Sequence, residues 1–156
     1  MHIRLLAVGD RQPSWVDDAF AVYAARLPRE WKFRIDAIPT ARRSKSDRSG
    51  KARQAEGERI LAGVERSDFA VLLDERGRQL DSKGLARKLG QWQSDGRDVC
   101  FIIGGPDGVS ADCRARADFT WSLSSLTLPH GLARVLLAEQ LYRAHALRTG
   151  HPYHRE

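Results

Sequence analysis

Residues 99–108 read VCFIIGGPDG, an unbroken apolar run that ends in two glycines and a proline turn. A second compact apolar run lies at Phe69–Leu73, and an apolar-rich run at Ile3–Val8 is followed by Gly9. Runs of this length, bounded by turn residues, are typical of strands that are covered on both faces. They predict the central strands of a sheet.

Segments with helical spacing of apolar residues separate these runs. Ser14 and Ser82 are each placed to cap a helix, and the longest helical pattern extends from about His130 to Arg148. The other expected elements are strands at Trp31–Ile38 and Phe119–Leu128 and helices around Ile60 and from Ser110 to Arg116. Strands that alternate with helices predict an α/β fold, with a mainly parallel sheet sandwiched by helices.

The length and composition limit the class of protein. A chain of 156 residues with 42% hydrophobic content can bury one core, so a single domain over residues 1–156 is expected. No apolar stretch approaches the roughly 20 residues that a membrane-spanning helix needs, and the first residues show no export signal. Cys100 and Cys113 lack the spacing of a redox or zinc site. We therefore expect a cytoplasmic protein with two buried thiols and no metal.

The charge of the chain is basic and locally concentrated. Lys and Arg number 26 against 20 Asp and Glu, a formal net charge of +6 that suits a polyanionic partner. The segment from Thr40 to Arg53, here called the basic segment, has one acidic and six basic residues: Asp47, and Arg42, Arg43, Lys45, Arg48, Lys51 and Arg53. The basic segment fits either a solvated loop or an arm that follows phosphates.

The final helical pattern is apolar on more than one face. Its apolar residues are Leu132, Val135, Leu136, Leu137, Leu141, Tyr142 and Leu147. At about 100° per residue, these positions are spread too widely for one narrow stripe. One face can cover the sheet of its own chain, and a second copy of the chain is the simplest cover for the other.

Two segments have patterns that suit a ligand pocket. Gly104 and Gly105 fit either a tight turn or a backbone that approaches a ligand without side chains in the way. They form neither a GxGxxG fingerprint nor a phosphate-binding P-loop, which disfavours a nucleotide dehydrogenase or an NTPase. Residues 121–130 alternate hydroxyl groups with leucines before a proline, as in a two-sided strand or a pocket wall. No GxSxG motif or triad supports a catalytic serine.

The chain ends in His151-Pro152-Tyr153-His154-Arg155-Glu156. Two histidines three residues apart would suit a metal, but Pro152 interrupts helical geometry and no further ligand cluster is evident. Chain ends are also often disordered. In favour of function, an aromatic ring, an imidazole and a guanidinium in succession suit base stacking, proton transfer and phosphate contact.

Together these features resemble a known family. Residues 103–108, Trp121 to Pro129 and residues 151–156 resemble the small ribosomal RNA large-subunit methyltransferases that methylate N3 of a pseudouridine. Residues 7–9 and 95–99 also fit, and the resemblance extends over essentially the whole chain. That family belongs to the SPOUT class of methyltransferases.

The resemblance implies a homodimer with a deep C-terminal trefoil knot that holds S-adenosylmethionine. The matching cofactor positions are Leu73, Gly104, Leu123, Ser124, Ser125, Leu126, Thr127 and Leu128. The implied substrate is the pseudouridine in helix 69 of 23S rRNA, within the assembled 70S ribosome. Tyr153, His154 and Arg155 are expected to act in catalysis, with His154 as base or hydrogen-bond partner, Tyr153 in stacking and Arg155 on an anion. Glu139 could participate.

Two other functions stay open on the sequence alone. A non-catalytic RNA-binding protein of the same fold would use the basic surface and would not need a methyl-donor pocket. A metal hydrolase built on His151 and His154 would lose its activity to chelators.

Overall fold

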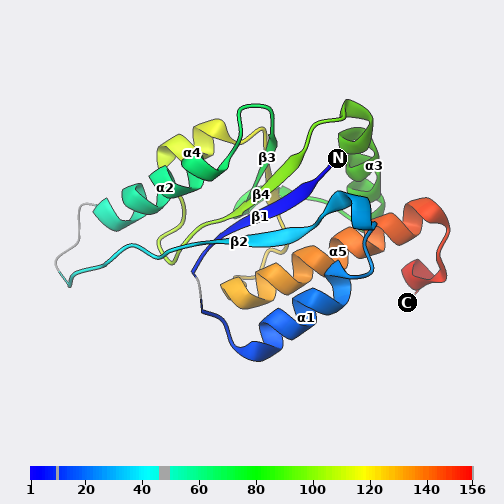
Figure 1. The fold of residues 1–156 in the computed structure, drawn as a ribbon, viewed down its shortest axis with the longest axis horizontal. Helices are drawn as coiled ribbons and strands as arrows, with labels where there is room; N and C mark the ends of the chain where they lie inside the picture. The colour runs from blue at the N-terminus through cyan, green and yellow to red at the C-terminus, as the bar shows by residue number, and fades with distance from the viewer. Residues whose placement is uncertain (10, 46–49, 156) are drawn as a thin grey trace.

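The strands of the sheet run parallel to one another (Figure 1). The computed structural model describes residues 1–9, 11–45 and 50–155, except for the side chain of His154. The strands are β1 (Ile3–Val8), β2 (Arg34–Ile38), β3 (Phe69–Gln79), β4 (Val99–Ile103) and β5 (Phe119–Ser122). Their order is β2-β1-β4-β3-β5, and every neighbouring pair is parallel. The predicted α/β fold with a mainly parallel sheet is confirmed, and the trefoil knot stays a prediction.

Helices cover both faces of this sheet (Figure 1). They are α1 (Ser14–Ala24), α2 (Lys51–Gly63), α3 (Ser82–Asp95), α4 (Ala111–Arg116) and α5 (His130–Thr149), with 3-10 turns η1 (Arg29–Trp31) and η2 (Pro152–Arg155). Helices α1, α3 and α5 pack on one face, and α2 and α4 on the other. Along β4, Val99, Phe101 and Ile103 join the first core, and Cys100 and Ile102 join the second. Because both faces of β4 are buried, the strand reads as one apolar run.

The structure also describes the two cysteines and the lengths of the helices. Cys100 and Cys113 are both buried and unpaired, as predicted. Burial raises the pKa of the Cys100 thiol to about 12, so this thiol stays protonated at neutral pH. In the part of the chain that the structure describes, no helix is long and apolar enough to cross a membrane.

The second strand is shorter than predicted. The sequence predicted a strand from Trp31, but Trp31 ends the 3-10 turn η1 and Lys32 has a left-handed φ of 48°. The indole of Trp31 is buried and meets the His145 ring edge-on, with 5.1 Å between the ring centroids. Packing of this ring against α5 outweighs the alternating pattern, and the strand begins at Arg34.

Both predicted serine caps are wrong by one residue. The N-cap of α1 is Pro13, and Ser14 is already the first helical residue. The N-cap of α3 is Asp81, whose Oδ1 accepts a hydrogen bond from the Gly84 amide at 2.6 Å, so Ser82 is inside the helix. Aspartate and serine are equally good caps, and in α3 it is the Asp81 side chain that reaches the Gly84 amide, so the helix begins one residue after Asp81. The helix predicted from Ser110 is confirmed, with Ser110 as its cap.

The last strand also ends early. A strand from Phe119 to Leu128 was predicted, but β5 stops at Ser122 and residues 123–129 form a loop. Ser122 Oγ donates to the Ser124 carbonyl at 2.8 Å, and Ser124 Oγ accepts from the Leu126 amide at 2.9 Å. These local bonds replace the ladder of a strand with a turn.

Strand β3 is longer than predicted and contains an irregularity. Its register with β5 shifts between Leu73 and Arg78, both of which pair with Trp121. Gly77 lies in this bulge, and a Cβ there would be only 2.8 Å from backbone atoms of Thr120 and Trp121. Glycine is therefore required for β3 to return to β5, and the extra residues bulge out at the end of the sheet.

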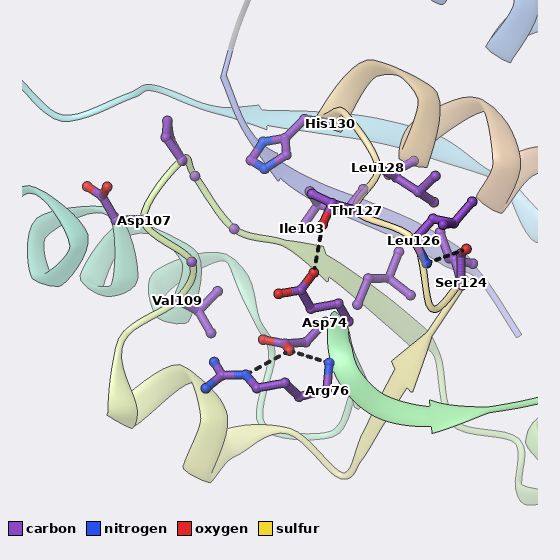
Figure 2. A pocket seen from close by; sticks show the side chains of 18 residues that line it. Asp74, Arg76, Ile103, Asp107, Val109, Ser124, Leu126, Thr127, Leu128 and His130 are labelled. Atoms are coloured by element: carbon purple, nitrogen blue, oxygen red, sulfur yellow. Dashed lines mark hydrogen bonds and ion pairs between the residues drawn. The ribbon is translucent and has the colours of Figure 1, made fainter.

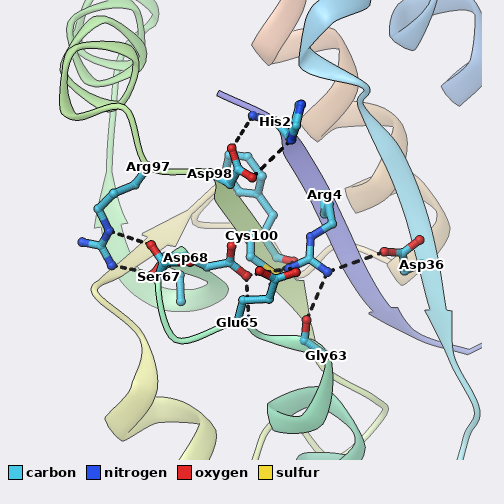
Figure 3. A network of polar contacts seen from close by, with 12 residues as sticks. His2, Arg4, Asp36, Gly63, Glu65, Ser67, Asp68, Arg97, Asp98 and Cys100 are labelled. Carbon is cyan, nitrogen blue, oxygen red and sulfur yellow. Dashed lines mark hydrogen bonds and ion pairs between the residues drawn. The ribbon is translucent and has the colours of Figure 1, made fainter.

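A polar network ties together the amino ends of β1, β3 and β4 (Figure 3). Arg4 Nη2 donates to Asp68 Oδ2 at 2.6 Å, and only 2% of the Asp68 side chain is exposed. The His2 backbone amide donates to Asp98 Oδ1 at 2.7 Å, and His2 Nδ1 lies 3.2 Å from Asp98 Oδ2. Residues at the start of β1 and just before β1, β3 and β4 are thus joined by charge-assisted bonds.

Replacing Asp98 with Asn is expected to lower the free energy of unfolding by about 0.5 kcal/mol at pH 7, since this exposed pair is screened by solvent. The hydrogen bond from the His2 amide lowers the pKa of Asp98 below its ordinary 3.8. A lowered folded-state pKa stabilises the protein above the unfolded pKa, and this contribution disappears as the pH falls through the folded value. Denaturation of both proteins at pH 7 and at lower pH measures this difference in the free energy of unfolding. A difference between the two proteins that persisted in strong acid would contradict this reasoning.

Candidate active site

A cavity of about 520 Å³ lies at the carboxyl ends of β4 and β5, beside the bulge of β3 (Figure 2). Residues 73–76 and 103–109 line it, together with most of 123–128, and with His130 and Ala133 of α5. Ligands of open parallel sheets bind at this edge, outside the carboxyl ends of the strands. The volume is in the range of pockets for small molecules and cofactors.

The loop from Gly104 to Val109, here called the glycine loop, folds tightly on itself beside the cavity. The Gly108 amide donates to the Gly105 carbonyl at 3.0 Å. A Cβ on Gly104 would lie 2.6 Å from Val109 Cγ1 and 3.0 Å from the Gly108 backbone. Gly104 therefore allows the loop to close, and any side chain there would push the loop out of place.

Seven of the eight expected cofactor positions line the cavity: Leu73, Gly104, Leu123, Ser124, Leu126, Thr127 and Leu128. Ser125 is exposed and is not among the lining residues. Thr127 Oγ1 donates to Glu75 Oε2 at 3.2 Å, which joins the 123–128 wall to the bulge of β3. The fold thus gathers residues from three strand ends around one space.

Charged groups from β3 form one side of the cavity (Figure 2). Asp74 accepts from Arg114 Nη2 at 2.6 Å and from the Arg76 amide at 2.9 Å. Burial alone would raise the pKa of Asp74, but these hydrogen bonds lower it. Asp74 therefore stays ionised, and because it forms ion pairs with Arg114 and Arg76, this side of the cavity carries charges of both signs.

One imidazole, from His130, points into the cavity from the first turn of α5 (Figure 2). Burial, and then the nearby charge of Arg134, lower its pKa below the ordinary value of 6.5. His130 is therefore neutral at pH 7 and can accept a proton or a hydrogen bond. Arg134 is itself buried, and its Nη2 donates to the Gly9 carbonyl at 2.5 Å.

The C-terminal residues pack on α5. Tyr153 Oη donates to Glu139 Oε1 at 2.9 Å, and the Tyr153 ring centroid lies 4.6 Å from that of Tyr142. The guanidinium carbons of Arg26 and Arg143 are 6.0 and 5.0 Å from the same ring centroid. Burial, followed by the hydrogen bond to Glu139, raises the pKa of Tyr153, so the phenol stays protonated.

These tail residues do not join the cavity of their own chain. Tyr153 is not among the lining residues, and Arg155 is exposed. The predicted role of His154 lies outside the described residues, because its side chain is not described. Among the residues that are described, no group of three or more His, Cys, Asp or Glu side chains could hold a metal.

Sequence reasoning missed the cavity residues Asp74, Glu75 and Arg76, and it assigned no role to Asp107 and His130 within the segments that it singled out. A usable signal was present for the first three, because they directly follow the apolar run Phe69–Leu73. Polar residues that come right after a buried parallel strand lie at the edge where ligands bind. His130 carried a weaker signal, since it follows the proline that begins the last helix.

One family model matches nearly the whole chain. Its description is Predicted SPOUT methyltransferase, and it aligns with residues 1–154. The chain belongs to the SPOUT methyltransferase family. The resemblance drawn from the glycine loop, the 121–129 segment and the terminal residues is thereby confirmed.

Curated relatives of this SPOUT methyltransferase match it from end to end. A protein named Ribosomal RNA large subunit methyltransferase H, from Thioalkalivibrio sulfidiphilus, is 48% identical over 156 residues, with 100% of both chains covered. The protein of the same name from Hahella chejuensis is 46% identical over 156 residues, again with 100% of both chains covered.

Two solved structures resemble this SPOUT methyltransferase in fold. A probable methylase family protein from Haemophilus influenzae Rd KW20 has a TM-score of 0.59 at 10% identity, over 96% of this chain and 69% of that one. A putative methylase family protein from Neisseria gonorrhoeae has a TM-score of 0.57 at 12% identity, over 90% and 81%. At such low identity the likeness concerns the fold alone.

Proposed function

We propose that this enzyme transfers a methyl group from S-adenosylmethionine to N3 of the pseudouridine in helix 69 of 23S rRNA, in the assembled 70S ribosome. The observation that carries the proposal is the end-to-end match, at 46% and 48% identity, to proteins named Ribosomal RNA large subunit methyltransferase H. The basic charge of the chain suits an RNA substrate. A ribosomal substrate also places the enzyme in the cytoplasm.

The cavity suits S-adenosylmethionine in size and chemistry. Leu73 and the leucines of 123–128 offer apolar surface to an adenine, and the backbone of the same loop offers amides and carbonyls to its edge. Gly104 belongs to the same site, and Ser125 could contribute only through its backbone or after a small movement. Asp74 is paired with Arg114 and Arg76, so Glu75, which accepts a hydrogen bond from the Thr127 hydroxyl, is the carboxylate that can complement the positive charges of the cofactor. When bound, the cofactor supplies an electrophilic methyl group.

The protein has to orient N3, exclude water and accept the N3 proton. His130 is a neutral imidazole in the cavity wall and can act as the acceptor. His154 is the acceptor that the sequence suggests, with Tyr153 stacking on a base and Arg155 contacting a phosphate. Glu139 accepts a hydrogen bond from the Tyr153 hydroxyl, and we assign Glu139 the role of holding the tail in place.

A homodimer accounts for two features of the single chain. Trp15 and Val22 of α1 are 53% and 49% exposed, and Leu132 of the adjacent α5 is 40% exposed. This apolar surface needs a cover, and a second copy supplies one. Since Tyr153 does not line the cavity of its own chain, we infer that the tail of each chain serves the cavity of its partner.

Calorimetry with S-adenosylmethionine tests the cofactor proposal. Binding is expected in the presence of EDTA, because backbone groups and carboxylates of the chain hold the ligand without a metal. Absence of heat at millimolar cofactor, with folded protein, would favour the non-catalytic RNA-binding alternative. Mass mapping of rRNA from a strain without the protein tests the substrate, and the expected change is loss of one methyl group from one pseudouridine.

Sedimentation at micromolar concentration tests the dimer. We expect one species with twice the 17.5 kDa mass of the chain, because the exposed residues of α1 and α5 would be buried in the pair. Trp15→Lys, which places a charge in that surface, should shift the species toward the monomer. A stable monomer that still methylates ribosomes would contradict both the dimer and the shared site.

A further inference from the structure

One guanidinium joins the basic segment to the glycine loop. Arg43 Nη1 and Nη2 donate to the two carboxylate oxygens of Glu56, at 2.9 and 2.7 Å. Arg43 Nε donates to Asp107 Oδ2 at 2.8 Å. Arg43 therefore bridges helix α2 and the loop that lines the cavity, using a planar group whose direction is fixed by the paired bonds.

Glu56 is the rigid end of this bridge. Only 2% of its side chain is exposed, and Oε2 also accepts from the Ala41 amide at 3.0 Å. A Cβ on Gly105 would lie 2.7 Å from Glu56 Oε1, so the carboxylate directly underlies the glycine loop. A buried carboxylate needs its ionic partner, which holds Arg43 and the backbone at residue 41 in one arrangement.

Asp107 is the adaptable end. Its side chain is 57% exposed, and Asp107 is also one of the residues that line the cavity (Figure 2). Exposed ion pairs are weak and can break without unfolding the protein. The position of the glycine loop can therefore depend on whether the Arg43–Asp107 pair is intact.

The other described cations of the basic segment face outward. The exposed side chains are those of Arg42, Lys45, Lys51 and Arg53. In contrast, only 25% of the Arg43 side chain is exposed. Exposed cations can meet RNA phosphates while Arg43 remains bound to Glu56 and Asp107. The segment thus has an outer surface for an anion and an inner contact with the cavity.

We infer that Arg43 is a positioning residue, which couples contact of RNA phosphates with the basic segment to the conformation of the glycine loop. The inference rests on the proposed function, which supplies the RNA and the cofactor. Phosphate contact with Arg42 and Lys45 would fix the backbone on both sides of Arg43 and so favour the intact Arg43–Asp107 pair, which holds the loop in the cofactor-binding arrangement. By linkage, cofactor and RNA must strengthen each other's binding by the same factor.

The coupling can be measured as the ratio of ribosome affinities with and without the demethylated product of the cofactor. With the full-length protein and unmethylated 70S ribosomes, we expect the product to tighten binding about fivefold. Asp107→Asn should bring this ratio close to one, whereas Asp107→Glu, which keeps the carboxylate, should retain it. Arg43→Met should also abolish the ratio.

Arg42→Met is the matched control, because it removes the same charge from the neighbouring position. It should weaken ribosome binding in a salt-dependent way and leave the ratio unchanged. Coupling that survived Asp107→Asn, or that was absent from the unaltered protein although it bound both ligands, would overturn the inference. If Arg43→Met fails to fold, the two Asp107 variants still test whether this bridge carries the coupling. Failure of the unaltered protein to bind the product would instead reject the proposed function.

Discussion

Deletion of residues 153–156 is expected to reduce methylation of saturating ribosomes by at least about 100-fold, the lower end of what positioned proton-transfer groups contribute. The deleted residues include a ring, an imidazole and a guanidinium that suit RNA contact. They contribute little to the core, although Tyr153 packs against Tyr142. The rate at which unmethylated ribosomes become methylated, measured with saturating ribosomes and cofactor, is the readout.

Stability and cofactor affinity are the controls for this deletion. The loss of the Tyr153 packing should cost about 1 kcal/mol of unfolding free energy, since aromatic pairs contribute on this scale. Cofactor affinity should change little, because the tail is proposed to act on RNA and no described tail residue lines the cavity of its own chain. Tyr153→Phe keeps the ring and removes the hydroxyl that bonds to Glu139, so it separates packing from hydrogen bonding. Normal turnover by the deleted protein would move the catalytic assignment to His130 and Glu139.

Gly104→Val should weaken binding of S-adenosylmethionine by about 100-fold, as expected when a packed site is overfilled by about 3 kcal/mol. The cause is steric, because even a Cβ would meet Val109 and the Gly108 backbone. The glycine loop would have to move out of its position beside the cavity. Calorimetry measures the affinity, and thermal unfolding checks that the protein remains folded.

A graded series makes the steric argument testable. Gly104→Ala should have a smaller effect than Gly104→Val, and adding Val109→Ala should restore part of the affinity by removing the 2.6 Å contact. Full affinity in Gly104→Val would reject the role of this loop in the cofactor site. Failure of Val109→Ala to restore any affinity would assign the effect to the Gly108 backbone.

The two variants can also be combined across a dimer. A chain without residues 153–156 keeps its cavity, and a Gly104→Val chain keeps its tail. If each tail serves the cavity of the partner, mixed dimers of two inactive chains should regain about half of one dimer's activity, because one of the two shared sites is intact. Activity that stayed absent from purified mixed dimers would place tail and cavity in the same chain.

The core strands could be predicted because burial on both faces leaves a plain signal. Phe69–Leu73 and Val99–Ile103 are continuous apolar runs, Ile3–Val8 is apolar except for Arg4, and all three form parallel strands. The half-exposed patterns were less reliable. Trp31 was diverted by packing on α5, and the hydroxyl groups after Ser122 formed local bonds that ended β5.

The site could be predicted where its residues are close in sequence, as in the glycine loop and the 123–128 wall. Sequence spacing gave no indication that Arg43 would meet Asp107, which is 64 positions away, because such a contact depends on the strand order. The location of the tail also could not be predicted from the sequence, because the contacts of Tyr153 with Glu139 and Tyr142 depend on a turn after Gly150. Roles assigned to individual site residues stay predictions.

The polar network of Arg4, Asp68, His2 and Asp98 lies at the amino ends of the strands, whereas the cavity lies at their carboxyl ends. We expect this separation to affect how the fold can evolve. Substitutions in the loops around the cavity leave the anchoring bonds intact, so they can alter ligand preference without bringing the chain close to its stability threshold. New specificities could therefore accumulate at one end of the sheet while the other end keeps the chain folded.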